Sequence, residues 1–190
     1  MKITNQRLLP AALFVSALQM SPQPPSEAKT KASIPPRFED YRVSEVFNGQ
    51  PSPPILATPE QRMFRTRITD GVSKGWGVLR DGREGSTPGP NFAGHYIAIQ
   101  WGCGTDCGQM AIVDGSTGLV YPPPFGGKGK GWSYFHYPAR FIYPPQFQVN
   151  SQLLILPNIC AAQTPVCGTY YFVWRNNRWH EVRREPMSLR

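Results

Sequence analysis

Hydrophobic and polar positions alternate with a period of two from His95 to Trp101. His95, Ile97, Ile99 and Trp101 fall on one face of this stretch, and Tyr96, Ala98 and Gln100 fall on the other. Such alternation is typical of a β-strand whose two faces have different surroundings. Two apolar runs, residues 110–113 and 119–121, then enclose the turn-forming residues Asp114 to Gly118. This pattern predicts a β-hairpin.

The last third of the chain repeats the strand pattern. Residues 152–156 are an apolar run that suits a central strand. Residues 170–174 and 178–182 enclose Asn176-Asn177, two residues that tolerate the positive φ of a tight hairpin turn. We therefore predict a mainly β (α+β) fold, a single antiparallel, curled sheet of about six short strands with one short helix packed on it.

The helix is predicted to begin at Thr58-Pro59-Glu60-Gln61. Thr58 can accept from the free N–H groups of the first turn, Pro59 suits the first helical position, and Gln61 stands where a capping-box partner belongs. Apolar residues follow at a spacing of four, which predicts one buried stripe: Phe64, Ile68 and Val72. Asp70-Gly71 is expected to end or loosen this helix.

The N-terminal residues have the pattern of a secretory signal peptide. Lys2 and Arg7 precede an apolar run, Leu8 to Leu18, which is shorter than an ordinary membrane span. We assign residues 1–20 to the signal peptide, 21–36 to a Pro-rich tether and 37–190 to one β-rich domain. The mature chain is then periplasmic or secreted and has no membrane span; an uncleaved anchor is the alternative.

Cysteines and composition fit an exported, loop-rich domain. The 190 residues include 21 prolines and 18 glycines, which punctuate short strands. Four cysteines in an exported chain favour disulfides. Glycines on both sides of Cys103 favour a local bond to Cys107, and Cys160 could likewise pair with Cys167, although crossed pairings remain open. The spacing of a redox or zinc motif is missing, so we expect no cofactor and no metal.

Charge narrows the choice of partners only slightly. The formal net charge is +8, and +6 once Lys2 and Arg7 leave with the signal peptide. A basic surface favours an anionic cell-wall polymer or an acidic envelope protein. No nucleic-acid-binding motif accompanies the charge, so nucleic acid is not an expected partner. Nothing in the sequence predicts the oligomeric state.

Three motifs carry a resemblance to a family: Gly89–Tyr96, Trp101–Cys107, and Ile112–Asp114 with Thr117-Gly118. Together they resemble uncharacterised exported bacterial proteins with an FAGhY…WGCGxxC…ivDxxTG pattern. The resemblance implies an exported β-domain without a named activity. The short cysteine-closed loop is also similar in shape to the inhibitory loop of periplasmic inhibitors of vertebrate lysozyme, although it is shorter and lacks a histidine.

Candidate binding residues lie in two loops. Gly104, Thr105 and Asp106 are enclosed by Cys103 and Cys107, and Trp132 and Tyr134 belong to a Gly- and aromatic-rich stretch, residues 122–145. Aromatic side chains in such a loop could grip a sugar or a peptide, or could instead pack back onto the sheet. We predict a non-enzymatic binding or inhibitor-like domain of the cell envelope.

Two other functions remain open. An envelope hydrolase could use His95 with Asp106, or with Asp114, as an acid–base pair, because histidine titrates near neutrality and a carboxylate can orient it. Thr105 or Ser116 would then be the nucleophile, although no G-x-S-x-G context surrounds either residue. The other alternative is a purely structural envelope component that uses its tether as a spacer.

Overall fold

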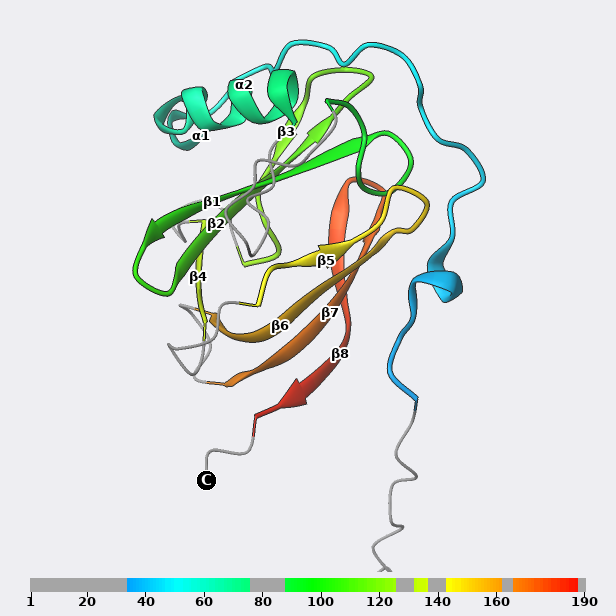
Figure 1. Cartoon of the computed structure of the whole chain (residues 1–190), viewed down its shortest axis with the longest axis vertical. Helices are drawn as coiled ribbons and strands as arrows, with labels where there is room; N and C mark the ends of the chain where they lie inside the picture. The colour runs from blue at the N-terminus through cyan, green and yellow to red at the C-terminus, as the bar shows by residue number, and fades with distance from the viewer. Residues whose placement is uncertain (1–33, 76–87, 126–131, 137–142, 162–165, 188–190) are drawn as a thin grey trace, which may run out of the picture. The chain divides into compact units, whose positions relative to one another are not determined.

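Eight strands form one antiparallel sheet in the described part of the structure, a computed structural model (Figure 1). The strand order is β1-β2-β4-β6-β7-β8, with β3 beside β2 and β5 beside β6. β1 and β8 are the two ends of this order, so the sheet is open, and the prediction of a mainly β fold is confirmed. The strands are β1 (Tyr96–Gly104), β2 (Cys107–Asp114), β3 (Val120–Tyr121), β4 (Ser133–His136), β5 (Gln146–Phe147), β6 (Leu153–Ala161), β7 (Cys167–Arg175) and β8 (Arg178–Pro186).

The described residues all belong to one unit that begins at Ile34. They are residues 34–75, 88–125, 132–136, 143–161 and 166–187. The predicted signal peptide (1–20) and most of the predicted tether (21–33) lie outside them. No helix among these residues has the length and apolar character needed to cross a membrane.

The predicted hairpins are present. β1 pairs with β2 from Tyr96 opposite Asp114 onwards, and β2 pairs with β3 around the turn that starts at Asp114. Asn176 and Asn177 join β7 to β8 with φ values of 51° and 57°, the left-handed conformation expected of this dipeptide. The apolar run predicted as a central strand belongs to β6, which has hydrogen-bonded neighbours on both sides.

The predicted helix is present but is split at Phe64. α1 (Pro59–Met63) begins with the expected capping box: Thr58 Oγ1 accepts from the Gln61 backbone N–H at 3.2 Å, and Gln61 Oε1 accepts from the Thr58 N–H at 3.0 Å. Gln61 also donates to the Val120 carbonyl at 2.9 Å, which ties the helix start to the sheet. α2 (Arg65–Lys74) follows directly.

The expectation that Asp70-Gly71 ends the helix is wrong. α2 continues to Lys74 and ends at Gly75, whose φ is 67°. Gly71 is buried against Ile99 of β1, and a Cβ atom at position 71 would overlap the isoleucine side chain. The glycine therefore lets α2 approach the sheet closely instead of ending the helix.

Both faces of the sheet are covered. The first face carries an aromatic-rich core, and the second is covered by α1 and α2 over the β1–β2 hairpin and by a short 3-10 helix, η1 (Phe38–Tyr41), over β6 and β7. Alternate β1 residues divide between these cores as predicted. The first core contains Phe92, Ala93, Tyr96, Ala98, Met110, Ile112, Tyr134, Leu154, Leu156, Ile159, Tyr170, Phe172 and Trp174; the helix-covered core contains Ile68, Val72, Ile97, Ile99, Trp101, Ala111, Val113, Val120 and Trp132.

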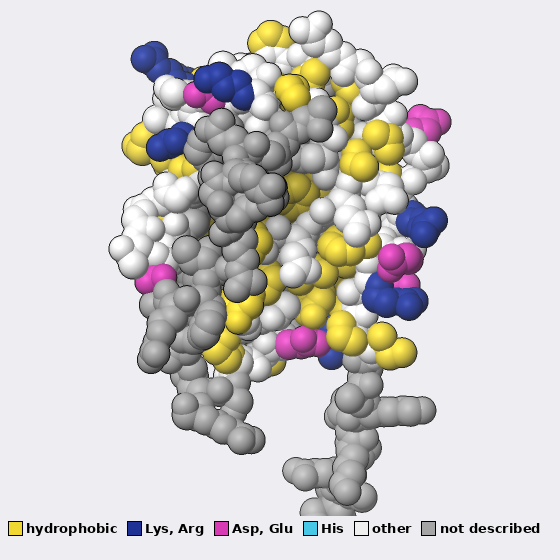
Figure 2. Space-filling model, in the orientation of Figure 1, with side chains coloured by type: hydrophobic (Ala, Val, Ile, Leu, Met, Phe, Trp, Pro, Cys, Tyr) yellow, Lys and Arg dark blue, Asp and Glu magenta, His cyan; other side chains and the backbone are white. Residues whose placement is uncertain are grey.

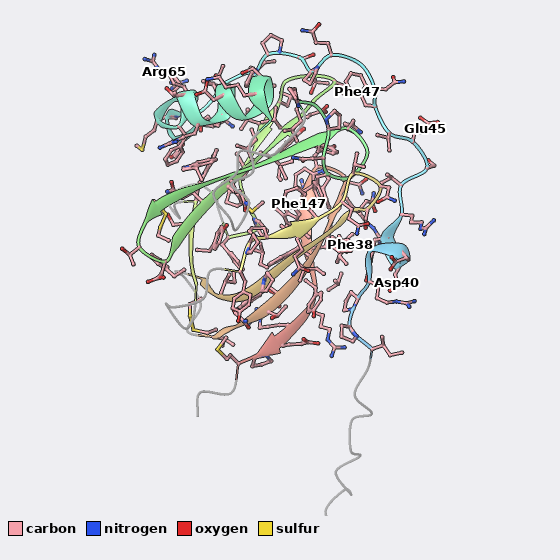
Figure 3. All side chains as sticks on the ribbon, viewed as in Figure 1. Phe38, Asp40, Glu45, Phe47, Arg65 and Phe147 are labelled. Atoms are coloured by element: carbon pink, nitrogen blue, oxygen red, sulfur yellow. A yellow bond between two sulfur atoms is a disulfide. The ribbon has the colours of Figure 1, made fainter. Side chains whose placement is uncertain are left out.

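The segment before α1 is attached to the sheet at several points. Phe38 packs against buried residues of β6 and β7, whereas Asp40 points away to solvent (Figure 3). The buried Ser151 hydroxyl donates to the Phe38 carbonyl at 2.9 Å, and the Val43 N–H donates to the Asn150 carbonyl at 3.0 Å. From Phe38 onwards this segment is therefore part of the domain.

Candidate functional site

The β1–β2 hairpin ends in an exposed tip that a disulfide closes. Cys103 and Cys107 are bonded, with their Cα atoms 5.1 Å apart. Gly104 (φ 140°) and Asp106 (φ 58°) turn the chain between them. Gly104 and Thr105 are exposed, and Asp106 is half-buried. Three predicted binding residues are thus presented together on a short, covalently closed turn.

Cys160 and Cys167 form the second disulfide, with Cα atoms 4.2 Å apart. Both bonds are local, so the crossed pairings left open by the sequence do not occur in the structure. No described cysteine is free. The described residues also contain no group of three or more His, Cys, Asp or Glu side chains that could hold a metal ion.

The two disulfides lie in one row across the sheet. Cys107 pairs with Phe135 of β4, Phe135 pairs with Cys160, and Cys160 pairs with Cys167. Residues directly opposite each other in antiparallel strands share a face. The row therefore places Phe135, which is 43% exposed, between two disulfides on the face that also holds α1 and α2.

The two aromatic binding candidates, Trp132 and Tyr134, are core residues. Trp132 is 4% exposed and packs on Phe64 with ring centroids 5.5 Å apart. Tyr134 is 3% exposed and crosses over Gly108, and burial raises the pKa of its hydroxyl far above the ordinary value. Neither side chain is offered to a ligand in this conformation. Residues 126–131 and 137–142 of the same predicted loop lie outside the described residues.

A groove of about 330 Å³ lies beside the disulfide tip. It runs between the junction of α1 with α2 and the distal part of the β1–β2 hairpin. Over these helices Lys and Arg side chains gather (Figure 2), and Arg65 points away from the sheet (Figure 3). The groove lining consists of Met63, Phe64, Thr66, Arg67, Trp101, Gly102 and Gln109.

Hydrogen bonds fix the floor of this groove. The Trp101 indole Nε1 donates to Gln109 Oε1 at 2.7 Å, and Gln109 Nε2 donates to Ser133 Oγ at 3.0 Å. Phe64 packs on Trp101 with ring centroids 5.2 Å apart. The sequence predicted Phe64 only as part of a buried stripe, and it gave no signal that Met63, Arg67 and Gln109 would meet here.

The proposed acid–base pair of His95 with Asp106 does not form. Tyr96, next to His95, pairs with Asp114, whereas Gly104 pairs with Cys107 at the other end of the same hairpin. His95 and Asp106 therefore lie at opposite ends of β1. A strand of this length separates them by far more than hydrogen-bonding distance.

His95 instead lies near Asp114, with Nε2 3.9 Å from Oδ2. Asp114 Oδ1 accepts from the Ser116 N–H (2.9 Å), the Ser116 hydroxyl (2.6 Å) and the Thr117 N–H (3.3 Å). Burial raises the pKa of Asp114, but these hydrogen bonds and the neighbouring His95 outweigh it, so the pKa lies below its ordinary value. The Ser116 hydroxyl is bonded to the carboxylate and not to His95. The three hydrogen bonds to Asp114 Oδ1 hold this turn.

No protein-family model matches this chain, and neither a curated protein nor a solved structure does.

Proposed function

We propose that this chain is an exported cell-envelope protein that binds a partner without catalysing a reaction, through the disulfide-closed tip of the β1–β2 hairpin. The observation that carries this proposal is the exposure of the tip: Gly102, Cys103, Gly104 and Thr105 are all exposed, beside the groove that Gly102 helps to line. The tip is therefore exposed to solvent and held in position in the free protein.

The rigidity of the tip supports a binding role. The Cys103–Cys107 bond closes a loop with a sequence separation of only four residues, and the Cys160–Cys167 bond lies on the same face of the sheet. A loop that is already ordered loses little conformational entropy when it binds, so more of its contact energy is available as affinity.

Export is part of the proposal and is supported by two features. Residues 1–20 have the composition of a signal peptide. All four cysteines are paired in disulfides, which persist in oxidising compartments such as the periplasm and the extracellular space.

The most direct test is capture of a partner from envelope extract. The bait is the exported protein with both disulfides formed, compared with a Thr105→Ala/Asp106→Ala variant. The matched control is Asn48→Ala/Gln50→Ala, two exposed residues remote in sequence from the tip. We expect one protein that wild type and control retain and the tip variant loses.

Two results would contradict the proposal. A partner retained equally by the tip variant would place the contact elsewhere. Turnover of a cell-wall, ester or peptide substrate that is lost in His95→Ala would replace a binding protein with an enzyme. Cosedimentation of the same baits with isolated cell wall tests whether the partner is an anionic polymer of the wall instead of a protein.

A further inference from the structure

Cys103 is the extra residue of a β-bulge at the end of strand β1. Gly102 pairs with Gly108 and Gly104 pairs with Cys107, so Cys103 has no residue opposite it on β2. Cys103 is exposed, and a Cβ atom added to Gly102 or to Gly104 would meet open space. A reagent can therefore reach the disulfide at Cys103 past two neighbours that have no side chain.

The second disulfide is less accessible. Cys160 and Cys167 are both half-buried and lie directly opposite each other in the ladder between β6 and β7. Phe135 of β4 pairs with Cys160 on its other side. Exchange requires access to one of the two sulfurs, and exposed disulfides are the labile ones. The described chain thus holds one disulfide suited to exchange and one suited to a structural role.

A chain of hydrogen bonds ends at the Cys103 sulfur. The Trp101 indole donates to Gln109 Oε1 at 2.7 Å, and Gln109 Nε2 donates to Ser133 Oγ at 3.0 Å. Ser133 Oγ lies 4.0 Å from Cys103 Sγ. A disulfide sulfur has no proton to donate, so the Ser133 hydroxyl is the donor in this contact. Each donor in the chain is therefore directed towards Cys103.

The Ser133 hydroxyl suits a thiolate better than a disulfide. Sulfur in a disulfide is a weak acceptor, which fits the length of the contact with Cys103. When the disulfide is broken, Cys103 can ionise, and a hydrogen bond to a charged acceptor is shorter and roughly twice as strong. Ser133 therefore stabilises the reduced form of Cys103 more than the oxidised form, which makes the tip easier to reduce.

We propose that the Cys103–Cys107 disulfide is a redox switch of the tip. A protein dithiol opens it, Cys103 forms the mixed disulfide, and the Ser133 hydroxyl stabilises the Cys103 thiolate. This inference rests on the proposed binding function and adds its regulation, because the closed turn is the proposed contact surface. The oxidised tip binds the partner and the reduced tip releases it.

The exchange takes two steps. A thiolate of the dithiol attacks Cys103 Sγ, the bond to Cys107 breaks, and its electron pair goes to Cys107 Sγ, which takes up one proton from the dithiol. The second thiolate of the dithiol then attacks the dithiol's own sulfur in the mixed disulfide, and Cys103 leaves as a thiolate that accepts from Ser133. The dithiol is oxidised to a disulfide, the tip is reduced, and the remaining proton goes to water.

Variants with a single free thiol test the contact with Ser133. Cys107→Ser leaves a thiol at Cys103, and Cys103→Ser leaves one at Cys107 as the matched control. The rate of alkylation by iodoacetamide reports the thiolate in each. At pH 7 we expect Cys103 to react about tenfold faster than Cys107, and about threefold more slowly once Ser133→Ala is added. Ser133→Thr keeps a hydroxyl and should restore the rate.

The pH profile separates this role from a structural one. At about pH 10 the Cys103 thiol is ionised with or without the hydroxyl, so Ser133→Ala should no longer be slower. Two charged residues flank Cys103: Asp106 in the same turn and Arg67 in the groove lining beside Gly102. Both are kept in every variant and do not contribute to the difference. Near-ultraviolet circular dichroism checks the fold. Equal rates at pH 7, or a difference that persists at pH 10, would overturn the inference.

Dithiothreitol, a small dithiol, tests the switch in the wild-type protein. The protein is equilibrated with mixtures of reduced and oxidised dithiothreitol, and alkylation followed by mass spectrometry measures the reduced fraction of each disulfide. We expect Cys103–Cys107 to be half-reduced at a ratio of reduced to oxidised dithiothreitol about tenfold lower than Cys160–Cys167. The same ratio for both disulfides, or the opposite order, would overturn the inference.

Envelope capture separates the switch from the function on which it rests. The baits are the oxidised protein and the protein reduced only at the tip, with dithiothreitol removed under nitrogen before the extract is added. A partner captured by the oxidised bait and lost by the reduced one supports the switch. If both baits capture it equally but Thr105→Ala/Asp106→Ala loses it, the tip binds and the switch is wrong. If the oxidised bait captures nothing, the binding function fails, and the switch fails with it.

Discussion

Gly71 of helix α2 packs against Ile99 of strand β1. A Cβ atom there would overlap several atoms of the buried Ile99 side chain. Glycine usually weakens a helix interior by about 1 kcal/mol relative to alanine. At position 71 the steric cost of a Cβ atom outweighs the gain in helix propensity. Ile99 is branched at Cβ and lies in a packed core, so its side chain has little room to move.

Gly71→Ala should therefore destabilise the domain despite its better helix propensity. Overpacking costs roughly 1–3 kcal/mol and the propensity gain offsets about 1 kcal/mol of it, so we expect a net loss of roughly 1 kcal/mol in the free energy of unfolding. Urea denaturation measures this change. Ser73→Ala, on the exposed face of the same helix, is the control and should stay within about 0.5 kcal/mol of wild type. Equal or higher stability of Gly71→Ala would contradict the close packing.

Asp114 should make stability depend on pH. Its pKa in the folded chain lies below the ordinary value of 3.8, so the folded state favours the ionised form. The stabilisation is complete above that ordinary value and is lost as the pH falls through the lower, folded pKa. In thermal melts, the advantage of wild type over Asp114→Asn should shrink as the pH falls from about 6 to about 3. A constant difference over that range would show that the charge contributes nothing.

Asp114→Ala removes the acceptor as well as the charge. The Ser116 and Thr117 groups that it satisfies would then depend on water. We expect a loss of about 1–3 kcal/mol at pH 7, measured by urea denaturation. A loss no larger than that of Asp114→Asn would mean that the shape of the turn does not depend on this carboxylate.

At the level of elements, local signals were predictable and long-range ones were not. The capping box at Thr58, the Asn176-Asn177 turn and the two sides of β1 follow from neighbouring residues, and all are confirmed. The insertion of β4 between β2 and β6 depends on pairing between distant segments, which periodicity does not encode. Trp132 and Tyr134 were predicted as ligand contacts for the same reason. Their burial depends on the position of β4 between β2 and β6, which the local sequence pattern does not predict.

In the candidate site, too, the local features were predictable from the sequence and the long-range contacts were not. The closed turn from Cys103 to Cys107 was identified from its glycines and spacing. The groove was not predicted, because it brings together a helix junction and a hairpin far apart in the sequence. The predicted pairing of His95 with Asp106 is wrong for a related reason. The two residues are close in the sequence, but the extended strand β1 lies between them and holds them at its opposite ends.

Removal of the tip disulfide should lower both the stability of the domain and its binding to the partner, whereas removal of the second disulfide should lower stability alone. A loop as short as that from Cys103 to Cys107 contributes about 2 kcal/mol in the chain-entropy model. We expect Cys103→Ser/Cys107→Ser to lose about that much stability in urea denaturation and to capture less of the envelope partner. Cys160→Ser/Cys167→Ser is the matched control, with a similar loss of stability and unchanged capture. Loss of capture in both variants would mean that folding, and not the closed tip, limits binding.

For the whole molecule, β4 joins two parts that each form from local pairings. β1, β2 and β3 are consecutive hairpins, and β6, β7 and β8 are another set. β4 hydrogen-bonds to both sets, and Tyr134 from its centre enters the aromatic core.

Tyr134→Ala should therefore weaken the whole sheet and not only one strand. Truncation of a large buried aromatic side chain costs about 3–5 kcal/mol. Tryptophan fluorescence and far-ultraviolet circular dichroism should report the same, lowered urea midpoint, because both sets of hairpins share the core that β4 completes. Separate midpoints would show that the two sets unfold independently.

The contact between the start of the domain and its last strand has a mechanical consequence. Arg183 of β8 donates a hydrogen bond to the Ile34 carbonyl at 3.4 Å, so the described chain enters the sheet beside the strand with which it ends (Figure 1). β8 is an edge strand held by one neighbour, and its last pair joins Pro186 to Gly168. A load applied between the two ends would act first on the Arg183–Ile34 hydrogen bond and on the bond from the Met187 N–H to the Cys167 carbonyl, just beyond that last pair, and would then open the β7–β8 ladder one rung at a time. Such peeling yields at low force, whereas a load along the strands must break many rungs together.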